Sequence, residues 1–98
     1  MGPPISRVTD IGMGHGSFPP SPAIAGSGNV FAGSLPVFRK GDPLMPHPSP
    51  SPSPPHPRAL QKGSSTVKTN NLDTGRIGDP IDCGGFMVQG LGTVLVGG

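Results

Sequence analysis

The sequence predicts an all-β protein: a small cone of short β-hairpins with pseudo-threefold internal repeats and Pro- and Gly-rich loops, stapled by one metal ion. Three observations support this prediction: a gap-free internal repeat, 17 Gly and 15 Pro among 98 residues, and three His with a single Cys. A chain of this length forms one small domain, residues 1–98. Because only 32% of the residues are hydrophobic, the domain needs a staple. One Cys excludes an intrachain disulfide, which leaves a metal, a partner or both.

Residues 26–43 and 63–80 are two copies of one unit. At a constant offset of 37, eight of the 18 positions are identical without a gap. The identical pairs are Gly26/Gly63, Ser27/Ser64, Val30/Val67, Leu35/Leu72, Arg39/Arg76, Gly41/Gly78, Asp42/Asp79 and Pro43/Pro80. Repetition at a period of tens of residues indicates supersecondary units that bury their apolar sides against one another.

Each copy predicts a β-hairpin with a two-residue turn. The predicted strands are residues 29–32 and 35–39 in the first copy, and residues 66–69 and 72–76 in the second. Gly33-Ser34 and Asn70-Asn71 occupy the same aligned turn positions, and Gly and Asn tolerate the positive φ that such turns need.

The period of two along a strand predicts which hairpin side chains face inward. It turns Val30 and Val67 toward the interior, with Phe31 and Lys68 outward.

A third unit is split between the two ends of the chain. Residues 90–94 are similar to residues 63–67, and the chain stops at Gly97-Gly98, where the turn belongs. Residues 5–8 then supply the outgoing strand, and residues 7–10 form a third, weaker Arg-x-x-Asp motif. We expect circular closure into a pseudo-threefold body, with both termini at the hairpin-turn end.

Proline-rich segments precede two of the predicted strands. By composition, residues 43–57 are typical of a disordered or polyproline II linker. However, residues 54–57 repeat the Pro-Pro-x-Pro pattern of residues 19–22 in the same place before a strand. This repetition favours ordered arms.

Each Arg-x-x-Asp motif is followed by a residue that binds metals, five positions after Asp10, five after Asp42 and four after Asp79. Under threefold closure these side chains converge on one axis, and a further His on the second arm reaches the same point. The predicted ligands are His15, His47, His56 and Cys83. Three imidazoles and a thiolate suit a closed, structural Zn²⁺ site better than an iron site. Its binding free energy would add to the stability of a thin core.

Simpler interpretations of these His and Asp residues compete with the metal site. A single His in a Gly- or Pro-rich loop is usually solvated, and the ligand spacing matches no zinc-finger signature, so the repeat register carries the metal prediction. For Asp10, Asp42 and Asp79, an Asx-type turn at a strand end competes with hydrogen bonding to a ligand imidazole.

The chain resembles the PAAR-repeat family. The matching stretches are residues 26–31 with 35–42, residues 76–84, and Gly14-His15-Gly16. The Pro-Ala-Ala-Arg signature is degenerate here, as Pro36-Val37-Phe38-Arg39 and as residues 73–76. These departures leave the three His and one Cys intact.

The resemblance implies a cone, with Zn²⁺ near its tip, that caps the trimeric spike of a contractile injection machine. The spike is a VgrG trimer in a type VI secretion system, or the central spike of a phage tail. We expect one copy per trimer and transient contact with a target membrane. The protein is cytoplasmic before firing and leaves through the secretion system, or it belongs to a virion tail tip. The base expected to face the spike comprises Gly33, Ser34, Asn70, Asn71, Gly97 and Gly98.

Composition and motifs weigh against several function classes. The net charge is only +2, without a basic run, and few aromatic residues are present, so nucleic-acid binding gains no support. The longest apolar run, residues 94–96, is far short of the ~20 residues of a membrane span, and no secretory signal opens the chain. We expect no enzyme, since nothing activates Cys83 as a nucleophile. A disordered interaction segment and a free-standing zinc-binding adaptor both stay compatible with the sequence.

Overall fold

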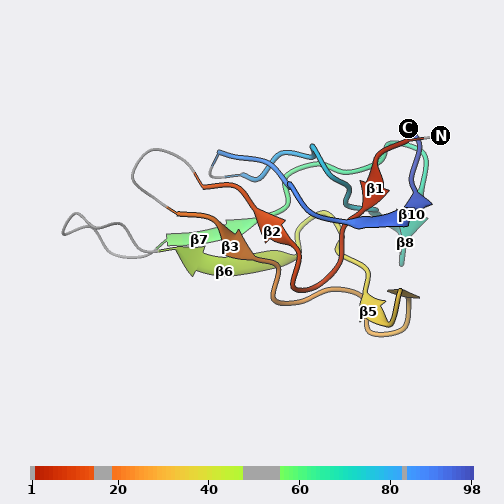
Figure 1. Cartoon of the computed structure of the whole chain (residues 1–98), viewed down its shortest axis with the longest axis horizontal. Helices are drawn as coiled ribbons and strands as arrows, with labels where there is room; N and C mark the ends of the chain where they lie inside the picture. Colours follow the sequence, from red (N-terminus) through yellow and green to blue (C-terminus); the bar gives the residue numbers. More distant parts are fainter. Residues whose placement is uncertain (1, 15–18, 48–55, 83) are drawn as a thin grey trace.

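A computed structural model describes residues 2–14, 19–47, 56–82 and 84–98, and within these ranges all regular structure is β (Figure 1). No helix long and apolar enough to cross a membrane occurs in this part of the chain. Antiparallel pairs form between β1 and β10, β2 and β3, β4 and β5, β6 and β7, and β8 and β9. The strands are β1 (Pro4–Ile5), β2 (Ile11–Gly12), β3 (Ser21–Pro22), β4 (Phe31–Ala32), β5 (Leu35–Pro36), β6 (Pro43–His47), β7 (His56–Ala59), β8 (Lys68–Thr69), β9 (Leu72–Asp73) and β10 (Leu91–Leu95). The predicted all-β class is confirmed.

The molecule has two unlike ends. The pairs β4–β5, β8–β9 and β1–β10 lie together with both termini, which we call the hairpin end (Figure 1). The pairs β2–β3 and β6–β7 extend the other way and form the arm end (Figure 1). The predicted position of the termini is confirmed. Of the two arms predicted to be ordered, residues 21–22 form β3 and residues 56–57 begin β7, whereas residues 54 and 55 lie outside the described residues.

The two predicted hairpin turns are present. Gly33 and Ser34 have φ of 56° and 69°, and Asn70 and Asn71 have φ of 53° and 66°. Positive φ at both central residues is the geometry of a type I′ turn, which matches the twist of the flanking strands.

One detail of the hairpins differs from expectation. Val30 and Val67 are exposed by 38% and 40%, so the prediction that they face inward is wrong. Both precede a paired segment of only two residues per strand, so the alternation of faces does not extend to them. Phe31 and Lys68 face outward as predicted.

A ring of three backbone hydrogen bonds closes the chain on itself. The N–H of Ser6 donates to Gly75 O at 2.9 Å, Gly75 donates to Phe38 O at 2.8 Å, and Phe38 donates to Ser6 O at 3.0 Å. Each of these residues immediately precedes the Arg of one Arg-x-x-Asp motif. The three units therefore meet as the sequence repeat predicts.

Further hydrogen bonds repeat the same pseudo-threefold relation. Val8, Lys40 and Ile77 donate to the carbonyls of Pro36, Asp73 and Pro4 at 2.9, 2.8 and 3.0 Å. Thr9, Gly41 and Gly78 donate to Ala23, Leu60 and Met87 at 2.9, 2.9 and 2.7 Å. Three equivalent glycines also lie close to the backbone of a neighbouring chain segment. A β-carbon on Gly26 would lie 2.5 Å from Val37 O, one on Gly63 would lie 2.6 Å from Thr74 O, and one on Gly90 would lie 2.5 Å from Ile5 O. The split third unit is thus confirmed.

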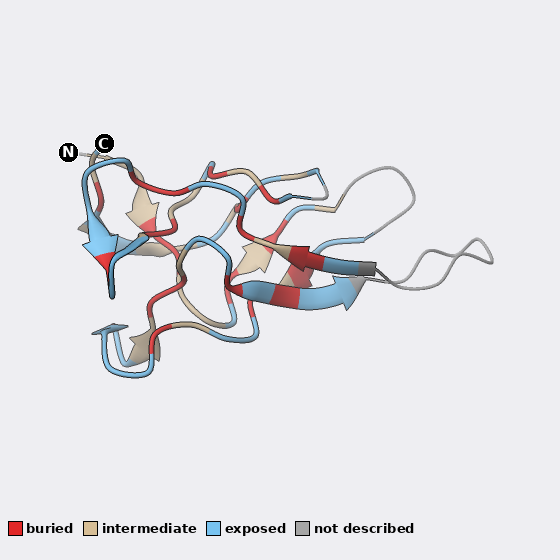
Figure 2. Ribbon diagram, turned by 180° about the vertical axis from the view of Figure 1, so that it is seen from behind, coloured by how far each residue is buried: buried red, intermediate tan, exposed pale blue. Residues whose placement is uncertain are grey.

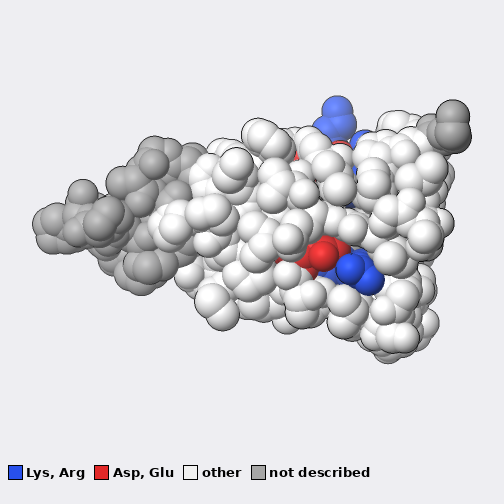
Figure 3. Space-filling view, viewed as in Figure 1, with Lys and Arg blue, Asp and Glu red and all other residues white. Residues whose placement is uncertain are grey.

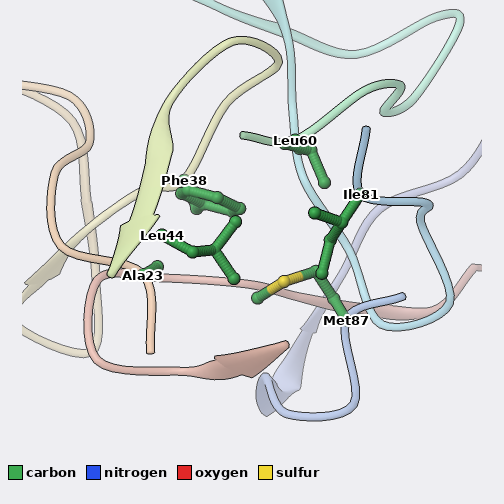
Figure 4. Packing of buried hydrophobic residues seen from close by; sticks show 6 residues of the cluster. All are labelled: Ala23, Phe38, Leu44, Leu60, Ile81 and Met87. Carbon is green, nitrogen blue, oxygen red and sulfur yellow. The ribbon is translucent and has the colours of Figure 1, made fainter. Parts of the chain in front are cut away.

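The core is asymmetric although the backbone is nearly symmetric. One buried cluster comprises Ala23, Phe38, Leu44, Leu60, Ile81 and Met87 (Figure 4). Phe38 fills the axis because its equivalents in the other units are Ser6 and Gly75. Gly12 is the equivalent of Leu44 and Ile81, and a β-carbon there would lie 2.5 Å from Leu44 Cδ2 and 2.6 Å from Ile81 Cδ1. Large and small residues alternate around the axis so that the narrow interior is filled.

A second cluster lies at the hairpin end. It comprises Ile5, Ala32, Val37 and Val96, with Leu91 and Val94 packed against it. In the β8–β9 hairpin the positions of Ala32 and Val37 are taken by Thr69 and Thr74, whose hydroxyls are 2.8 Å apart. Buried segments thus run from the hairpins into the arms (Figure 2).

Each Arg-x-x-Asp motif is a closed turn with a buried carboxylate. The Asp N–H donates to the Arg carbonyl in all three motifs, at 2.9–3.1 Å. In return, Oδ2 of Asp10, Asp42 and Asp79 accepts the backbone N–H of Arg7, Arg39 and Arg76 at 2.8, 3.0 and 2.8 Å. The same oxygens accept Nε at 3.3, 2.7 and 3.1 Å. Hydrogen bonding to the carboxylate raises the pKa of Arg39 and of Arg76. The Asp residues therefore stabilise local turns.

The same arginines join neighbouring units. Their Nη1 groups reach Ala32 O at 3.4 Å, Asn70 Oδ1 at 3.2 Å and Gly97 O at 3.1 Å. These acceptors lie at or beside the two hairpin turns and at the equivalent place near the C-terminus. Each motif therefore fixes its own turn and the hairpin of the next unit.

The third residue of each motif has positive φ: 81° at Thr9, 87° at Gly41 and 92° at Gly78. Glycine adopts this conformation without strain, whereas a β-branched residue does not. We expect Thr9→Gly to stabilise the protein by about 1 kcal/mol, measured by urea unfolding. Thr93→Gly, in β10 and without positive φ, should instead destabilise it. Equal losses in both variants would contradict the strain at Thr9.

A substitution at Gly12 tests whether the core around the pseudo-threefold axis is fully packed. Gly12→Ala should destabilise the protein by about 1–3 kcal/mol, because Leu44 and Ile81 occupy the space that the methyl group needs. Gly28→Ala is the matched control, since nothing lies within 4 Å of its added carbon. Thermal unfolding of both variants measures the difference. A Gly12→Ala protein as stable as the control would show that the core has room for the methyl group.

Candidate metal centre

Two of the four predicted ligands are paired across the arm hairpin. His47 ends β6, His56 begins β7, and their Cα atoms are partners in the β6–β7 register. The register shifts by one residue between Leu44 and His47, so a bulge brings the two histidines opposite each other. Residues directly opposite in an antiparallel pair have Cβ atoms about 4.5–5.5 Å apart. The backbone therefore places His47 and His56 at adjacent positions, as two ligands of a shared ion require.

The other two predicted ligands, His15 and Cys83, lie outside the described residues, but the residues beside them lie together. Met13 N donates to Phe86 O at 2.8 Å. A β-carbon on Gly85 would lie 2.3 Å from Met13 O and 3.2 Å from Gly14 O. The backbone shortly before His15 and the backbone shortly after Cys83 are thus in contact.

Hydrogen bonds also join β7 to both of these segments. Asp82 N donates to Ala59 O at 3.0 Å, and Ala59 N donates to Asp82 Oδ1 at 3.1 Å. On the other side, Arg58 Nη2 donates to Met13 O. The described neighbours of His15, His56 and Cys83 therefore form one connected network at the arm end.

The described residues contain no group of three or more His, Cys, Asp or Glu side chains arranged to hold a metal. The buried carboxylates of Asp10, Asp42 and Asp79 are already occupied by the arginines of their own motifs. These three carboxylates are therefore not free to bind an ion, and the site of three His and Cys83 stays a prediction.

The residues predicted to face a partner lie at the hairpin end, but some have internal roles. Asn70 Oδ1 accepts hydrogen bonds from Ser27 Oγ at 2.6 Å and from Arg39. Gly97 O accepts from Ser64 Oγ at 2.6 Å and from Arg76. The turns thus hold the units together, in addition to any contact with a partner.

Sequence reasoning missed the apolar surface of this end. Each of the three units exposes large apolar side chains in or beside β4, β8–β9 and β10: Val30 (38%), Phe31 (57%), Val67 (40%), Leu72 (39%) and Leu95 (47%). We call these five residues the apolar rim. Lys68 stands where the other units have Phe31 and Leu95, and its ion pair lowers the pKa of Asp73. The signal lay in the sequence, as apolar residues flanking each turn.

Comparison with known families agrees with this architecture. A family model described as the PAAR motif matches residues 13–89, which include both complete hairpins and all four predicted ligands. No curated protein is similar enough to be matched. The PAAR motif is associated with spike-tip proteins of type VI secretion systems. The chain, which the motif covers over more than half its length, therefore belongs to the PAAR-motif family.

Proposed function

We propose that this protein is the sharp, non-enzymatic tip that caps the trimeric β-helical spike of a contractile injection machine. The observation that carries the proposal is the ring formed by Ser6, Phe38 and Gly75, which makes one chain present three similar faces. A homotrimer offers three identical surfaces around its axis, so a chain with the same rotational relation can contact all three at once. One copy per trimer follows from this match.

The hairpin end is the surface that would meet the spike. The apolar rim places exposed hydrophobic groups on all three units there, and clustered exposed apolar surface is typical of interaction sites. The two-residue strands of the hairpins also leave edges that can pair with spike strands. The association of the PAAR motif with type VI secretion favours a VgrG-like spike. A phage tail spike is the alternative partner.

The arm end would carry one structural Zn²⁺, held by His15, His47, His56 and Cys83. The opposed positions of His47 and His56 and the contact between Met13 and Gly85 support this assignment. The ion would supply cross-linking, because each arm hairpin is held by few strand pairs. The chain's own part is to bring the four donors to one place.

The arm end also suits brief contact with a target membrane. Across residues 11–22 and 43–59, which span β2–β3 and β6–β7, Arg58 is the only Lys, Arg, Asp or Glu, and its side chain is buried. On the face shown in Figure 3, charged side chains gather near the middle and the hairpin end. An uncharged point lowers the cost of entering an apolar layer. Before firing the protein would wait in the cytoplasm and then leave through the secretion system; in a phage it would sit at the tail tip.

Binding to candidate VgrG trimers tests the proposed function. We expect one chain per trimer by native mass spectrometry. Phe31→Asp, in the apolar rim, should weaken binding at least tenfold, because a charge would be buried in the contact. Ile24→Asp is the control, since Ile24 is also exposed (47%) but belongs to none of the three hairpins. Equal weakening by both variants would contradict docking through the hairpin end. Zinc binding without affinity for any spike trimer would favour the free-standing adaptor.

Metal removal tests the proposed centre. Purified protein should contain one Zn²⁺ per chain by elemental analysis, and a chelator should lower its melting temperature, because ligand binding stabilises the folded state. His47→Ala and His56→Ala should each abolish tight binding, whereas Gln61→Ala, at an exposed site, should not. A metal-free protein whose melting is insensitive to chelator would contradict the centre. A fast-reacting thiol at Cys83 would then favour an enzyme.

A further inference from the structure

Arg58, in β7, is the largest fully buried side chain among the described residues, with 1% of its surface exposed. It differs from the other three arginines, each of which binds the Asp of its own motif. All five acidic side chains of the protein are described, and none forms an ion pair with Arg58. A buried charge without a counter-ion costs several kcal/mol. Core packing alone does not explain an arginine at this position, because an apolar side chain would fill the same space at a lower cost in free energy.

The guanidinium instead binds neutral oxygens of three chain segments. Nη1 donates to Ser21 Oγ at 2.8 Å and to Gly12 O at 3.4 Å, and Nη2 donates to Met13 O. Ser21 Oγ in turn lies 2.6 Å from Met45 O. One side chain on β7 thus connects to β2, to β3 and, through Ser21, to β6.

The position of Arg58 in the pseudo-threefold body shows why one long side chain reaches so far. Its equivalents in the other units are Ser21 and Gly85, which have a short side chain and none. Gly85 has φ of 82° and lies against Met13 O, so a side chain there is excluded. Arg58 therefore occupies this level of the axis alone, between the apolar cluster and the ends of the arms.

One polar atom of Arg58 is left unused. Nε is buried and has no hydrogen-bond partner among the described groups. An unsatisfied buried donor is unfavourable by itself. The side chain therefore holds a position set by its Nη contacts with the arms, at the expense of its own Nε.

We propose that Arg58 is a positioning residue for the metal centre: it fixes the strand that carries His56 against the segment that leads to His15. Met13 is two residues before His15, and Arg58 is two residues after His56. A hydrogen bond between them sets how far apart the two ligands begin. Metal sites tolerate errors of only about 0.5 Å in their ligands, and loss of supporting contacts commonly weakens binding 10–100-fold. This inference rests on the proposed Zn²⁺ centre.

Arg58→Met separates positioning from packing. Methionine keeps an unbranched apolar stem but removes every donor, and replacing a buried charge by an apolar group is often neutral or stabilising. Removing a positive charge should, by electrostatics alone, strengthen binding of a cation. We therefore expect Zn²⁺ affinity to fall 10–100-fold, measured by competition with a chromophoric chelator, while the urea midpoint of the metal-free protein is unchanged or higher. With Co²⁺ in place of Zn²⁺, the visible absorption spectrum of the Arg58→Met variant should be shifted relative to that of the wild-type protein.

Two further variants complete the experiment. Lys62→Met removes one positive charge at an exposed site and should leave affinity and spectrum unchanged. Arg58→Lys keeps the charge but loses the planar fork, so its affinity should fall between those of wild type and Arg58→Met. If Arg58→Met does not fold, Arg58→Lys decides: wild-type affinity in that variant overturns the proposal.

The outcomes distinguish this inference from the proposed centre. Wild-type protein that binds neither Zn²⁺ nor Co²⁺ overturns the centre, and the role of Arg58 with it. Wild-type binding that Arg58→Met reproduces, with the same spectrum, leaves the centre in place and overturns the inference. Weaker binding by Arg58→Met with unchanged stability of the metal-free protein supports both.

Discussion

Three backbone hydrogen bonds at the axis are the constraint on which the structure depends. Ser6, Phe38 and Gly75 each donate to one neighbour and accept from the other, so no unit is complete without the remaining two. The Arg-x-x-Asp turns then bind each unit to the next hairpin. Ser6 directly follows β1, which pairs with β10, so the ring is continuous with the pairing of the two ends of the chain. A protein in which most of the described strands have only two residues can be cooperative for this reason.

Because the pseudo-threefold symmetry is incomplete, a single chain can place different side chains at equivalent positions around the axis. Three identical side chains could not fill an axis as narrow as this one. Here Phe38 faces Ser6 and Gly75, and Arg58 shares its level with Ser21 and Gly85. One large residue and two small ones occupy the space without a void or a clash. The backbone keeps three similar outer faces for a threefold partner, while the interior is free to differ at every level.

The hairpin end and the arm end have different proposed roles. The apolar rim and the two hairpin turns lie at the hairpin end, where a spike would bind. The chain segments that span the arm pairs contain three of the four predicted ligands, His15, His47 and His56, and the only charged residue in them is the buried Arg58. A tip driven into a membrane would need cross-links, and both Arg58 and the proposed ion would supply them at the arm end. The Arg–Asp turns lie between the ends, so each end is held by interactions of its own.

Local rules in the sequence determined the hairpin turns, the repeat register and the split third unit, because turns and repeats depend on residues close together or aligned by a constant offset. They also predicted that His47, after its Arg-x-x-Asp motif, and His56, on the second arm, lie close together, although not the bulged register that sets their backbones opposite each other. Val30 and Val67 were assigned the wrong face, since two paired residues are too few to maintain a strand's alternation. The tertiary structure alone decided that Arg58 is buried and that Gly12 has no room for a methyl group. Each of these depends on which side chains meet across the axis, and contacts between residues tens of positions apart arise only when the ring closes.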